Sequence, residues 1–357
     1  MSILQIIGFT AVKILIIFTM MMLTVSYLVY FERKISAWAQ NRLGPNRVGW
    51  FGLLQPFADV FKLALKEDIV PINANKPIHA LAPMIALFVA FTTYAVIPFG
   101  PDVTLFGFTV PLVVADVNIG ILYILALSSL GVYAITLAGW SSGSKYSLLG
   151  GIRASAQMIS YEISMGFSVG GVILFAESLR PVAIVQAQHG WMWNAVLQPI
   201  GFITFLVSAF AETNRLPFDL PEAEPELVGG FHTEYSSMKF AGFFLAEYAN
   251  MIIASALIVT LYLGGWQFPY IENFGLPVGL VLAIQIISFF AKIAFLLFFF
   301  IWVRWSIPRF RYDQLMSLGW KVMFPLSLIN IIWVAILWIK NGENDIISSE
   351  RRCWSLY

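Results

Sequence analysis

Long apolar runs, separated by shorter polar segments, are the dominant pattern along this chain. The runs reach the roughly 20 residues that an α-helix needs to cross a bilayer at 1.5 Å per residue. They predict about eight transmembrane helices, near residues 5–30, 78–99, 118–139, 156–176, 191–211, 241–263, 276–303 and 320–340. The first run is longer than a ~7–15-residue signal-peptide core and no basic segment precedes it, so we expect it to remain as a helix.

We therefore expect a single all-α, polytopic membrane domain over residues 1–340, followed by a polar C-terminal tail at 341–357. The composition agrees with this pattern, because 59% of the residues are hydrophobic, 11% are charged and the mean hydropathy is +0.80. A soluble domain would carry about 25% charged residues. The composition thus excludes a soluble enzyme and leaves no segment for a separate soluble domain.

Residues that bind metals or form disulfides are scarce. The single cysteine is Cys353, so we expect neither a disulfide framework nor a thiolate-ligated zinc or iron–sulfur site within the chain. The three histidines, His79, His189 and His232, are far apart in the sequence and match no ligand spacing. We expect no metal or haem site here, and any redox centre belongs to a partner protein.

The basic residues predict the orientation in the membrane. Most of the 21 Lys and Arg lie in the loops that follow the first, third, fifth and seventh predicted spans. By the positive-inside rule, these loops face the cytoplasm, or the matrix of an organelle, and both termini face the opposite compartment. The two long polar segments, Glu32–Pro77 and Glu212–Lys239, lie on that side and are the first places to seek function.

The loop after the first span contains a short amphipathic helix over Trp50–Lys66. Asp59, Lys62 and Lys66 lie on one face of this helix. The apolar positions share the opposite face and are Leu53, Leu54, Phe57, Val60, Phe61 and Ala64. The segment is too short to cross a bilayer, so we expect it to lie in the interface. Two interpretations remain open at this point: an anchoring helix, or a wall of a binding site for a lipid-soluble substrate.

The loop between the fifth and sixth predicted spans is rich in acids. They are Glu212, Asp219, Glu222, Glu224, Glu226 and Glu234. Three prolines prevent a regular helix and interspersed apolar residues oppose full solvation, so we expect a folded insertion. Crowded carboxylates in a partly dry place suit a proton relay. A solvated acidic surface for basic partners and a calcium site are the alternatives.

Charged residues inside predicted spans include Glu162, Glu247 and Lys292. Glu162 and Glu247 each lie six residues into a span, roughly 9 Å below the interface. A carboxylate at that depth usually lines a water-filled path or pairs with a cation, so both are functional candidates. Lys292 lies midway along the seventh span, either as a neutral amine or as the partner of a glutamate.

The loop between the last two spans adds cations on the same side as the acidic loop. Its charged residues are Arg304, Arg309, Arg311, Asp313 and Lys321. We expect salt bridges between the two loops in preference to the binding of an anion.

Several long strings resemble one family. They are Glu32-Arg-Lys; Arg42-Leu-Gly-Pro-Asn-Arg-Val-Gly with Gly52-Leu-Leu-Gln-Pro-Phe-Ala-Asp; Tyr146-Ser-Leu-Leu-Gly-Gly-Ile-Arg through Ile159-Ser-Tyr-Glu; Ala211-Glu-Thr-Asn-Arg-Leu-Pro-Phe-Asp-Leu-Pro-Glu; Ala246-Glu-Tyr; and Pro308-Arg-Phe-Arg-Tyr-Asp-Gln-Leu-Met. Together they span roughly Tyr30–Pro325 and are far more specific than a short motif. The chain resembles the membrane subunit of proton-translocating NADH:quinone oxidoreductase, respiratory complex I, that is called subunit 1 in mitochondria.

The resemblance implies two groups of site residues. The first lines the quinone path and comprises Glu32, Arg33, Arg42, Phe57, Asp59, Phe231 and Arg309. The second couples quinone reduction to proton movement and comprises Glu162, Glu212, Glu222, Glu224, Glu226, Glu234 and Glu247, to which the intramembrane position adds Lys292. This chain departs from some members of the family, which carry an acid in the third span where it has Ser128-Ser129.

The resemblance also implies the surroundings. Ubiquinone or menaquinone would be the substrate, and FMN and the iron–sulfur clusters would lie in partner subunits, because this chain alone would bind no cofactor. The implied partners are peripheral-arm iron–sulfur and quinone-site subunits, small membrane subunits, antiporter-like subunits and membrane lipid, with no nucleic acid. The implied location is the bacterial plasma membrane, or alternatively the mitochondrial inner membrane. A stand-alone proton-coupled transporter, which usually shows paired repeats, and a subunit of a membrane-bound hydrogenase are the competing hypotheses.

Overall fold

The computed structural model describes residues 3–105, 108–188, 190, 192–220, 228–271 and 275–354. Within these ranges, seven helices are long and apolar enough to cross a membrane. They are α1 (Ile3–Ala39), α3 (Lys76–Tyr94), α4 (Gly120–Ser141), α5 (Lys145–Ala176), α10 (Ser237–Tyr262), α11 (Val278–Ser306) and the segment Tyr312–Lys340. That segment joins α12 (Tyr312–Leu318), the π-helical turn η4 (Gly319–Met323) and the first part of α13 (Phe324–Trp354). The expected polytopic, helical fold is confirmed.

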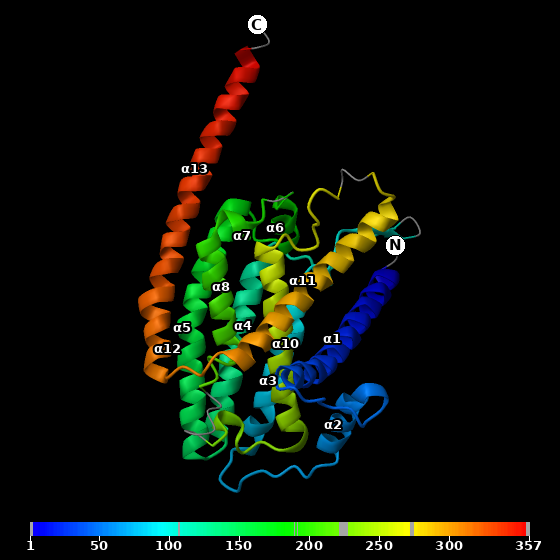
Figure 1. Cartoon of the computed structure of the whole chain (residues 1–357), viewed down its shortest axis with the longest axis vertical. Helices are drawn as coiled ribbons and strands as arrows, with labels where there is room; N and C mark the ends of the chain where they lie inside the picture. Colours follow the sequence, from blue (N-terminus) through cyan, green and yellow to red (C-terminus); the bar gives the residue numbers. More distant parts are fainter. Residues whose placement is uncertain are drawn as a thin grey trace.

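The fifth predicted span is shorter than expected. Instead of 191–211, the structure has the four-residue helix α7 (Asn194–Leu197) and then α8 (Pro199–Glu212), a helix of 14 residues. At 1.5 Å per residue α8 is about 21 Å long, less than the ~30 Å hydrocarbon core. The apolar run in the sequence continues across a break in the helix at Gln198, whose φ of −135° is not helical. Pro199 begins a new helix. α8 nevertheless packs in the bundle against α5, α10 and α13 and returns the chain to the end that carries α2 (Figure 1).

α10 lies at the centre of the bundle. It packs against α3, α11, α1 and α8, and 72% of its most apolar stretch is buried. The largest fully buried side chains near it include Tyr262, Phe205 and Met251. α1 and the last span are on the outside, since only 22% of each is buried, and their exposed Leu, Ile and Phe side chains suit contact with lipid.

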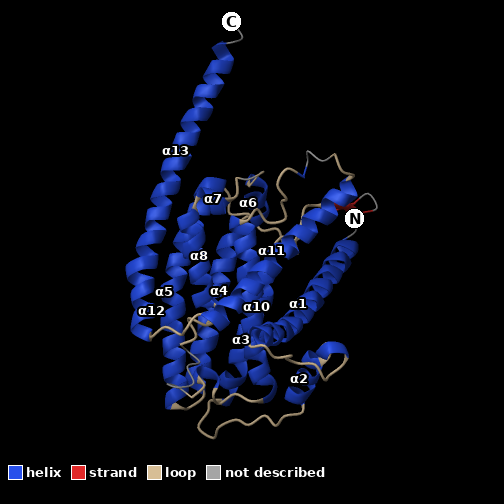
Figure 2. Ribbon diagram, in the orientation of Figure 1, coloured by secondary structure: helices blue, strands red, loops and turns tan. Residues whose placement is uncertain are grey.

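The two long polar loops lie at one end of the bundle (Figure 2). At the opposite end, β1 (Val103–Leu105) and β2 (Phe108–Val110) pair antiparallel between α3 and α4, with Val103 opposite Val110. This hairpin was not predicted, because two three-residue strands carry too little periodicity to be recognised. The short helix α6 (Pro181–Ala187) lies near α7 at that end (Figure 1).

The amphipathic helix after the first span is present as α2 (Gln55–Ala64), preceded by the short turn η1 (Trp50–Gly52). The hydroxyl of Tyr30 on α1 donates to the carbonyl oxygen of Phe51 at 2.7 Å and holds this turn against α1. Phe57 and Phe61 on α2 are exposed, so its apolar face is turned away from the bundle, as an interfacial helix requires.

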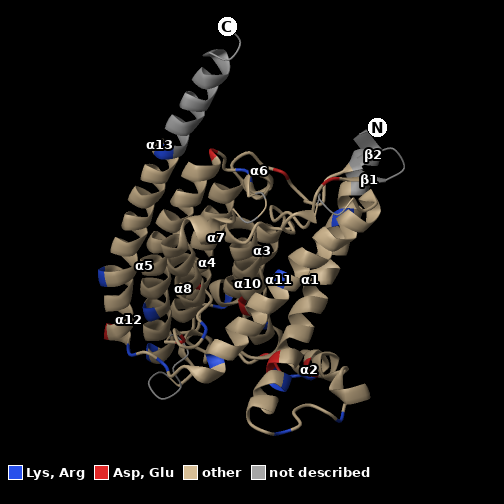
Figure 3. Ribbon diagram, turned by 45° about the horizontal axis from the view of Figure 1, so that its top comes forward, with Lys and Arg blue, Asp and Glu red and all other residues tan. Residues whose placement is uncertain are grey.

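The second long loop folds into the bundle where the structure describes it. Phe218, Leu220, Phe231 and Tyr235 are buried, and the short turn η2 (Gly230–His232) packs against α5. Charged residues are sparse along the outer helices, and many of them lie toward the end that carries α2 (Figure 3). Both long loops therefore belong to the polar end of the molecule.

Candidate functional site

A buried arginine, Arg215, is the centre of the candidate site. It follows α8 and is only 3% exposed. The segment that carries it is fixed by Gln157 on α5, whose amide donates to the carbonyl oxygens of Ala211 and Phe218, both at 2.8 Å. Because this amide connects the end of α8 to the loop beyond it, the backbone between them turns inward and presents Arg215 to the bundle.

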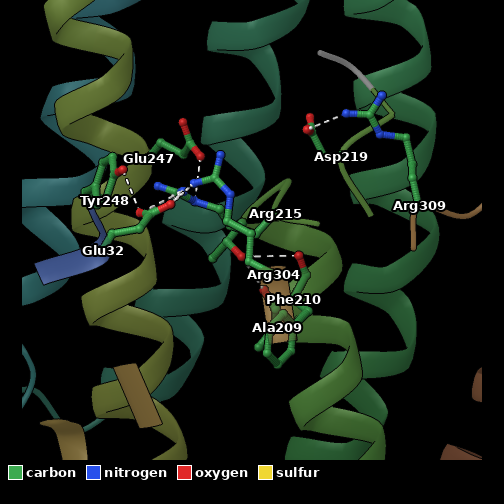
Figure 4. A network of polar contacts seen from close by, with 10 residues as sticks. Glu32, Ala209, Phe210, Arg215, Asp219, Glu247, Tyr248, Arg304 and Arg309 are labelled. Carbon is green, nitrogen blue, oxygen red and sulfur yellow. Dashed lines mark hydrogen bonds and ion pairs between the residues drawn. The ribbon is translucent and has the colours of Figure 1, made fainter. Parts of the chain in front are cut away.

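Two acids from distant parts of the chain pair with this arginine (Figure 4). Arg215 Nε lies 2.7 Å from Oε1 of Glu247 on α10, and Arg215 Nη1 lies 3.3 Å from Oε2 of Glu32 on α1. Glu32 also accepts a hydrogen bond from the hydroxyl of Tyr248 at 2.7 Å and pairs with Arg304 on α11. We call Glu32, Arg215, Glu247, Tyr248 and Arg304 the arginine–glutamate cluster.

The cluster balances its own charge, since two carboxylates face two guanidinium groups. Burial alone disfavours the charged form of Arg215, but the carboxylates of Glu247 and Glu32 and the Tyr248 side chain outweigh it and raise the pKa of Arg215. The guanidinium also lies over the Tyr248 ring, 4.1 Å from its centroid. A buried pair of this kind costs desolvation, so removing one partner is far more costly than replacing the whole set.

A second ion pair fixes the loop from the other side. Arg309 Nη2 lies 3.1 Å from Oδ2 of Asp219, which is 7% exposed (Figure 4). The predicted salt bridging between this loop and the loop after α11 is therefore present. It joins Arg309 to an acid that the resemblance had not placed among the site residues.

A cavity of about 100 Å³ runs beside the cluster into the bundle. Most of its lining is apolar, but Glu247 and Glu212 both face it, together with Ser128, Asn250 and His232. A water molecule needs on the order of 10–15 Å³ of such space and two to four polar partners. The cavity thus has room for several waters, and its polar lining places them beside both glutamates.

Glu162, the third membrane glutamate, lies near Glu212 but on a different helix. It interacts electrostatically with Glu212, and it accepts a hydrogen bond from Ser129 on α4. Ser128, the neighbouring residue, is hydrogen-bonded to Glu212. The two serines therefore lie where the third span meets both glutamates.

His232, in the turn η2, lies at the loop side of the cavity. Its ring packs against Phe231, Phe240 and Phe244 at centroid distances of 5.0, 5.5 and 6.5 Å. Burial among these rings lowers the pKa of His232 to about 4, so the imidazole is neutral at pH 7. A neutral imidazole both donates and accepts a hydrogen bond.

The structure places the predicted quinone residues at several separate positions. Glu32 is in the arginine–glutamate cluster, while Arg33, the next residue, points outward and pairs with Asp59 on α2 at 2.6 Å. Phe57, also on α2, packs against Tyr27 on α1 with 6.4 Å between the ring centroids. Arg42 is exposed and donates to the side chain of Gln40. Phe231 is buried, against Phe243 and Tyr235, on the cavity side.

Among the predicted proton-path residues, Glu162 and Glu212 interact and Glu247 faces the same cavity as Glu212, whereas Lys292 does not join them. Its ammonium group donates to the carbonyl oxygens of Leu263, Gly265 and Gln267 at 2.7, 3.0 and 2.8 Å. Lys292 therefore holds the turn after α10. Glu234 is partly buried between η2 and α10. Glu222, Glu224 and Glu226 lie outside the described residues.

The sequence missed Arg215, Arg304 and Tyr248 as site residues. Arginines next to predicted loops ordinarily extend to lipid headgroups or water, so nothing in the pattern marked these two as partners of a buried glutamate. The available signal was local charge balance, because Glu32 and Glu247 are close to predicted span ends and each needs a cation once desolvated. Within the described residues, no group of three or more His, Cys, Asp or Glu side chains is arranged to hold a metal ion.

Comparison with known proteins identifies the family of the chain. The family model for NADH dehydrogenase matches residues 12–335. The chain is 56% identical over 337 residues to NADH-quinone oxidoreductase subunit 8 of Rhodothermus marinus, covering 92% of this chain and 96% of that protein. It is 52% identical to an NADH-quinone oxidoreductase subunit of Salinibacter ruber, covering 92% and 95% of the two chains. The chain therefore belongs to the NADH dehydrogenase family, as a membrane subunit of an NADH-quinone oxidoreductase complex.

Proposed function

We propose that this chain forms the membrane-side wall of the quinone site and transmits quinone reduction to proton movement through its buried glutamates. One observation carries the proposal. Glu247 pairs with Arg215 in the arginine–glutamate cluster and also faces the cavity that Glu212 lines. A charge change at the cluster therefore acts directly on a carboxylate that faces a path for water.

The quinone side of the proposal rests on α2 and the end of α1. The exposed apolar face of α2 suits a lipid-soluble substrate, and the pair formed by Arg33 and Asp59 supplies polar atoms next to it. Glu32 lies one residue from Arg33, yet it points into the bundle. Adjacent residues at the end of α1 thus connect the proposed substrate wall to the buried cluster.

The coupling step follows from electrostatics. Reduction of a quinone to a quinol takes two electrons and two protons, and the electrons arrive from partner subunits. Negative charge that develops near the end of α1 repels Glu32 and attracts Arg215 and Arg304. If Arg215 shifts its pairing from Glu247, that carboxylate loses its partner and takes a proton from the cavity. The energy of reduction is in this way converted into proton uptake inside the membrane.

The surroundings of the chain are part of the same proposal. The peripheral iron–sulfur subunits would cover the end that carries α2, and small and antiporter-like membrane subunits would continue the proton path. The similar proteins come from bacteria, which favours the bacterial plasma membrane as the location. The substrate would be ubiquinone or menaquinone.

Paired substitutions in the assembled complex test the coupling role. Glu212→Gln and Glu247→Gln keep size and polarity but remove the titrating group, so proton pumping in liposomes should fall more than tenfold while the complex still assembles. Asp313→Asn is the matched control, because Asp313 forms an exposed pair with Arg311 at 3.1 Å and should have no effect. Normal pumping by both glutamine variants would remove the glutamates from the proton path.

The substrate wall needs its own measurement. Asp59→Asn should raise the KM for quinone and leave proton pumping per NADH oxidised unchanged, because it alters the α2 surface and not the buried path. An unchanged KM with reduced pumping would place Asp59 in the coupling machinery instead.

A further inference from the structure

Ser128 and Ser129 on α4 share one acceptor. The Ser128 hydroxyl contacts the carbonyl oxygen of Leu125 at 2.9 Å and the Ser129 hydroxyl contacts the same oxygen at 3.1 Å. Each hydroxyl also contacts a carboxylate, Ser128 that of Glu212 and Ser129 that of Glu162. The two glutamates come from α8 and α5, so α4 presents both hydroxyls at the point where three helices meet.

Each serine hydroxyl has one hydrogen and therefore donates to one acceptor at a time. If Glu162 is ionised, Ser129 donates to it. If Glu162 is protonated, the acid donates to Ser129 Oγ and the serine hydrogen turns to Leu125. The same alternatives hold for Ser128 and Glu212. The direction of each hydroxyl thus reports whether the glutamate beside it carries a proton.

The shared carbonyl oxygen of Leu125 links the hydrogen-bond arrangement of Ser128 to that of Ser129. The carbonyl oxygen of Leu125 has two lone pairs, and the helical N–H of Ser129 occupies one of them. One hydroxyl fills the remaining position, and the other is left to donate to its carboxylate. When Ser129 turns to Leu125, Ser128 is therefore directed to Glu212 and favours its ionised form. The reverse arrangement favours ionised Glu162.

We propose that Ser128 and Ser129 form a hydrogen-bond switch that makes Glu162 and Glu212 hold a proton alternately. The proton that leaves Glu212 passes to water in the cavity that Ser128 and Glu212 both line. The serines are positioning residues, since they direct protons between carboxylates and touch no substrate. This inference rests on the proposed proton path and names the part that couples two of its acids.

The test uses the assembled complex with Ser128→Ala, Ser129→Ala, both together, and the hydroxyl-retaining Ser128→Thr and Ser129→Thr. Protons pumped per NADH oxidised and the infrared bands of protonated carboxyl groups are measured across pH, with Glu162→Gln and Glu212→Gln assigning each band. The matched control is Ser255→Ala, because the buried Ser255 donates only within its own helix, to Met251 at 2.9 Å.

The double alanine variant should lose pumping about tenfold, the effect of one lost hydrogen bond to a charged group. Its two glutamate bands should titrate independently, whereas in the parent complex one rises as the other falls. The threonine variants should restore both behaviours. If alanine replacement prevents assembly, Ser→Cys variants, with a weaker donor, are measured instead and should show the same loss.

Parent-like pumping and coupled bands in the alanine variants would overturn the switch, and so would threonine variants that fail as badly as alanine. These results are distinct from failure of the proposed function. If the glutamine variants of Glu162 and Glu212 stop pumping while the serine variants do not, only the switch is wrong. If the glutamine variants pump normally, the proton path itself is wrong.

Discussion

Arg215 and Glu247 form the closest contact that the buried arginine makes within the arginine–glutamate cluster, with Nε 2.7 Å from Oε1. Arg215 lies in the loop after α8, whereas Glu247 lies on α10. Their pairing fixes the loop against the central helix. Because Glu247 also faces the cavity, its ion pair and its access to water are properties of the same carboxylate.

A double-mutant cycle measures what this contact contributes. Arg215→Gln alone leaves Glu247 without its cation, while Glu32 keeps Arg304, and it should destabilise the subunit by about 3–5 kcal/mol. Glu247→Gln alone should cost less, because Arg215 keeps Glu32 as a partner. With both changes the cost should be smaller than the sum of the two single changes.

The measurement is the thermal unfolding midpoint of the complex in mild detergent for the parent, the two single variants and the double variant. A coupling free energy of about 1–3 kcal/mol is expected for residues in one network. Strictly additive effects would show that Arg215 and Glu247 are near one another without interacting.

The sequence predicted the membrane glutamates but not the residues that pair with them, and the reason is physical. Depth in an apolar run identified Glu162 and Glu247, because a carboxylate there needs a cation or water wherever the helices pack. The partners of these acids depend on which helices meet. Arg215 comes to Glu247 only because Gln157 on α5 holds the end of α8, and Ser129 comes to Glu162 only because α4 and α5 are neighbours.

The fold was easier to predict than the site, and the difference at residues 191–211 has the same origin. Lipid imposes helices of a minimum length, so the apolar runs predict long helices, and seven are present among the described residues. The sequence 191–211 is apolar enough to cross but is divided at Gln198 and Pro199. Apolar content does not show such a break, because a short helix buried among α5, α10 and α13 has the same composition as a spanning one.

The partly buried His232 predicts a dependence of stability on pH. The pKa of His232 is about 4 in the folded protein and about 6.5 in an unfolded chain. Between these values the unfolded state binds more protons than the folded state, so stability decreases as the pH falls from about 6.5 toward 4. The decrease is at most about 1.4 kcal/mol per pH unit.

The variant His232→Asn removes this titration and should make the complex less sensitive to acid. Unfolding midpoints of the parent and variant complexes, measured from pH 7 to pH 4.5, should therefore converge as the pH falls if the parent is the more stable at pH 7. Parallel curves over that range would mean that His232 is protonated equally in the folded and unfolded states.

The backbones of α5 and the turn η2 approach so closely at Gly150 that adding one methyl group should disturb the structure. A Cβ atom on Gly150 in α5 would lie 2.8 Å from Cα of Gly230 and 2.9 Å from the amide nitrogen of Phe231. Gly150→Ala should therefore displace the turn η2 and the adjacent His232 from the cavity. Backbone has little freedom to yield here, so we expect a loss of stability of about 1–3 kcal/mol and reduced pumping.

Gly166→Ala on the same helix is the matched control. A Cβ atom there meets no other heavy atom within 4 Å, and alanine favours a helix more than glycine does. Gly166→Ala should leave pumping unchanged and the unfolding midpoint unchanged or slightly higher. Equal effects at the two positions would show that α5 does not require the close approach to η2.

Substitution of Lys292 tests whether this residue has a structural role or belongs to the proton path. Its ammonium group donates to Leu263, Gly265 and Gln267 and lies 4.4 Å from the ring centroid of Trp193. These contacts fix the turn between α10 and α11. Lys292→Met removes all of them at once, so the free energy of unfolding should fall by about 2–4 kcal/mol.

The decisive comparison is stability against pumping by the complex that remains folded. If Lys292 acts as a clamp, Lys292→Met lowers the unfolding midpoint and pumping per assembled complex is preserved. Lys292→Arg should recover only part of the lost stability, because a planar guanidinium does not direct its donors to three carbonyls of one turn as an ammonium group does. An unchanged midpoint with pumping abolished would instead assign Lys292 to the proton path.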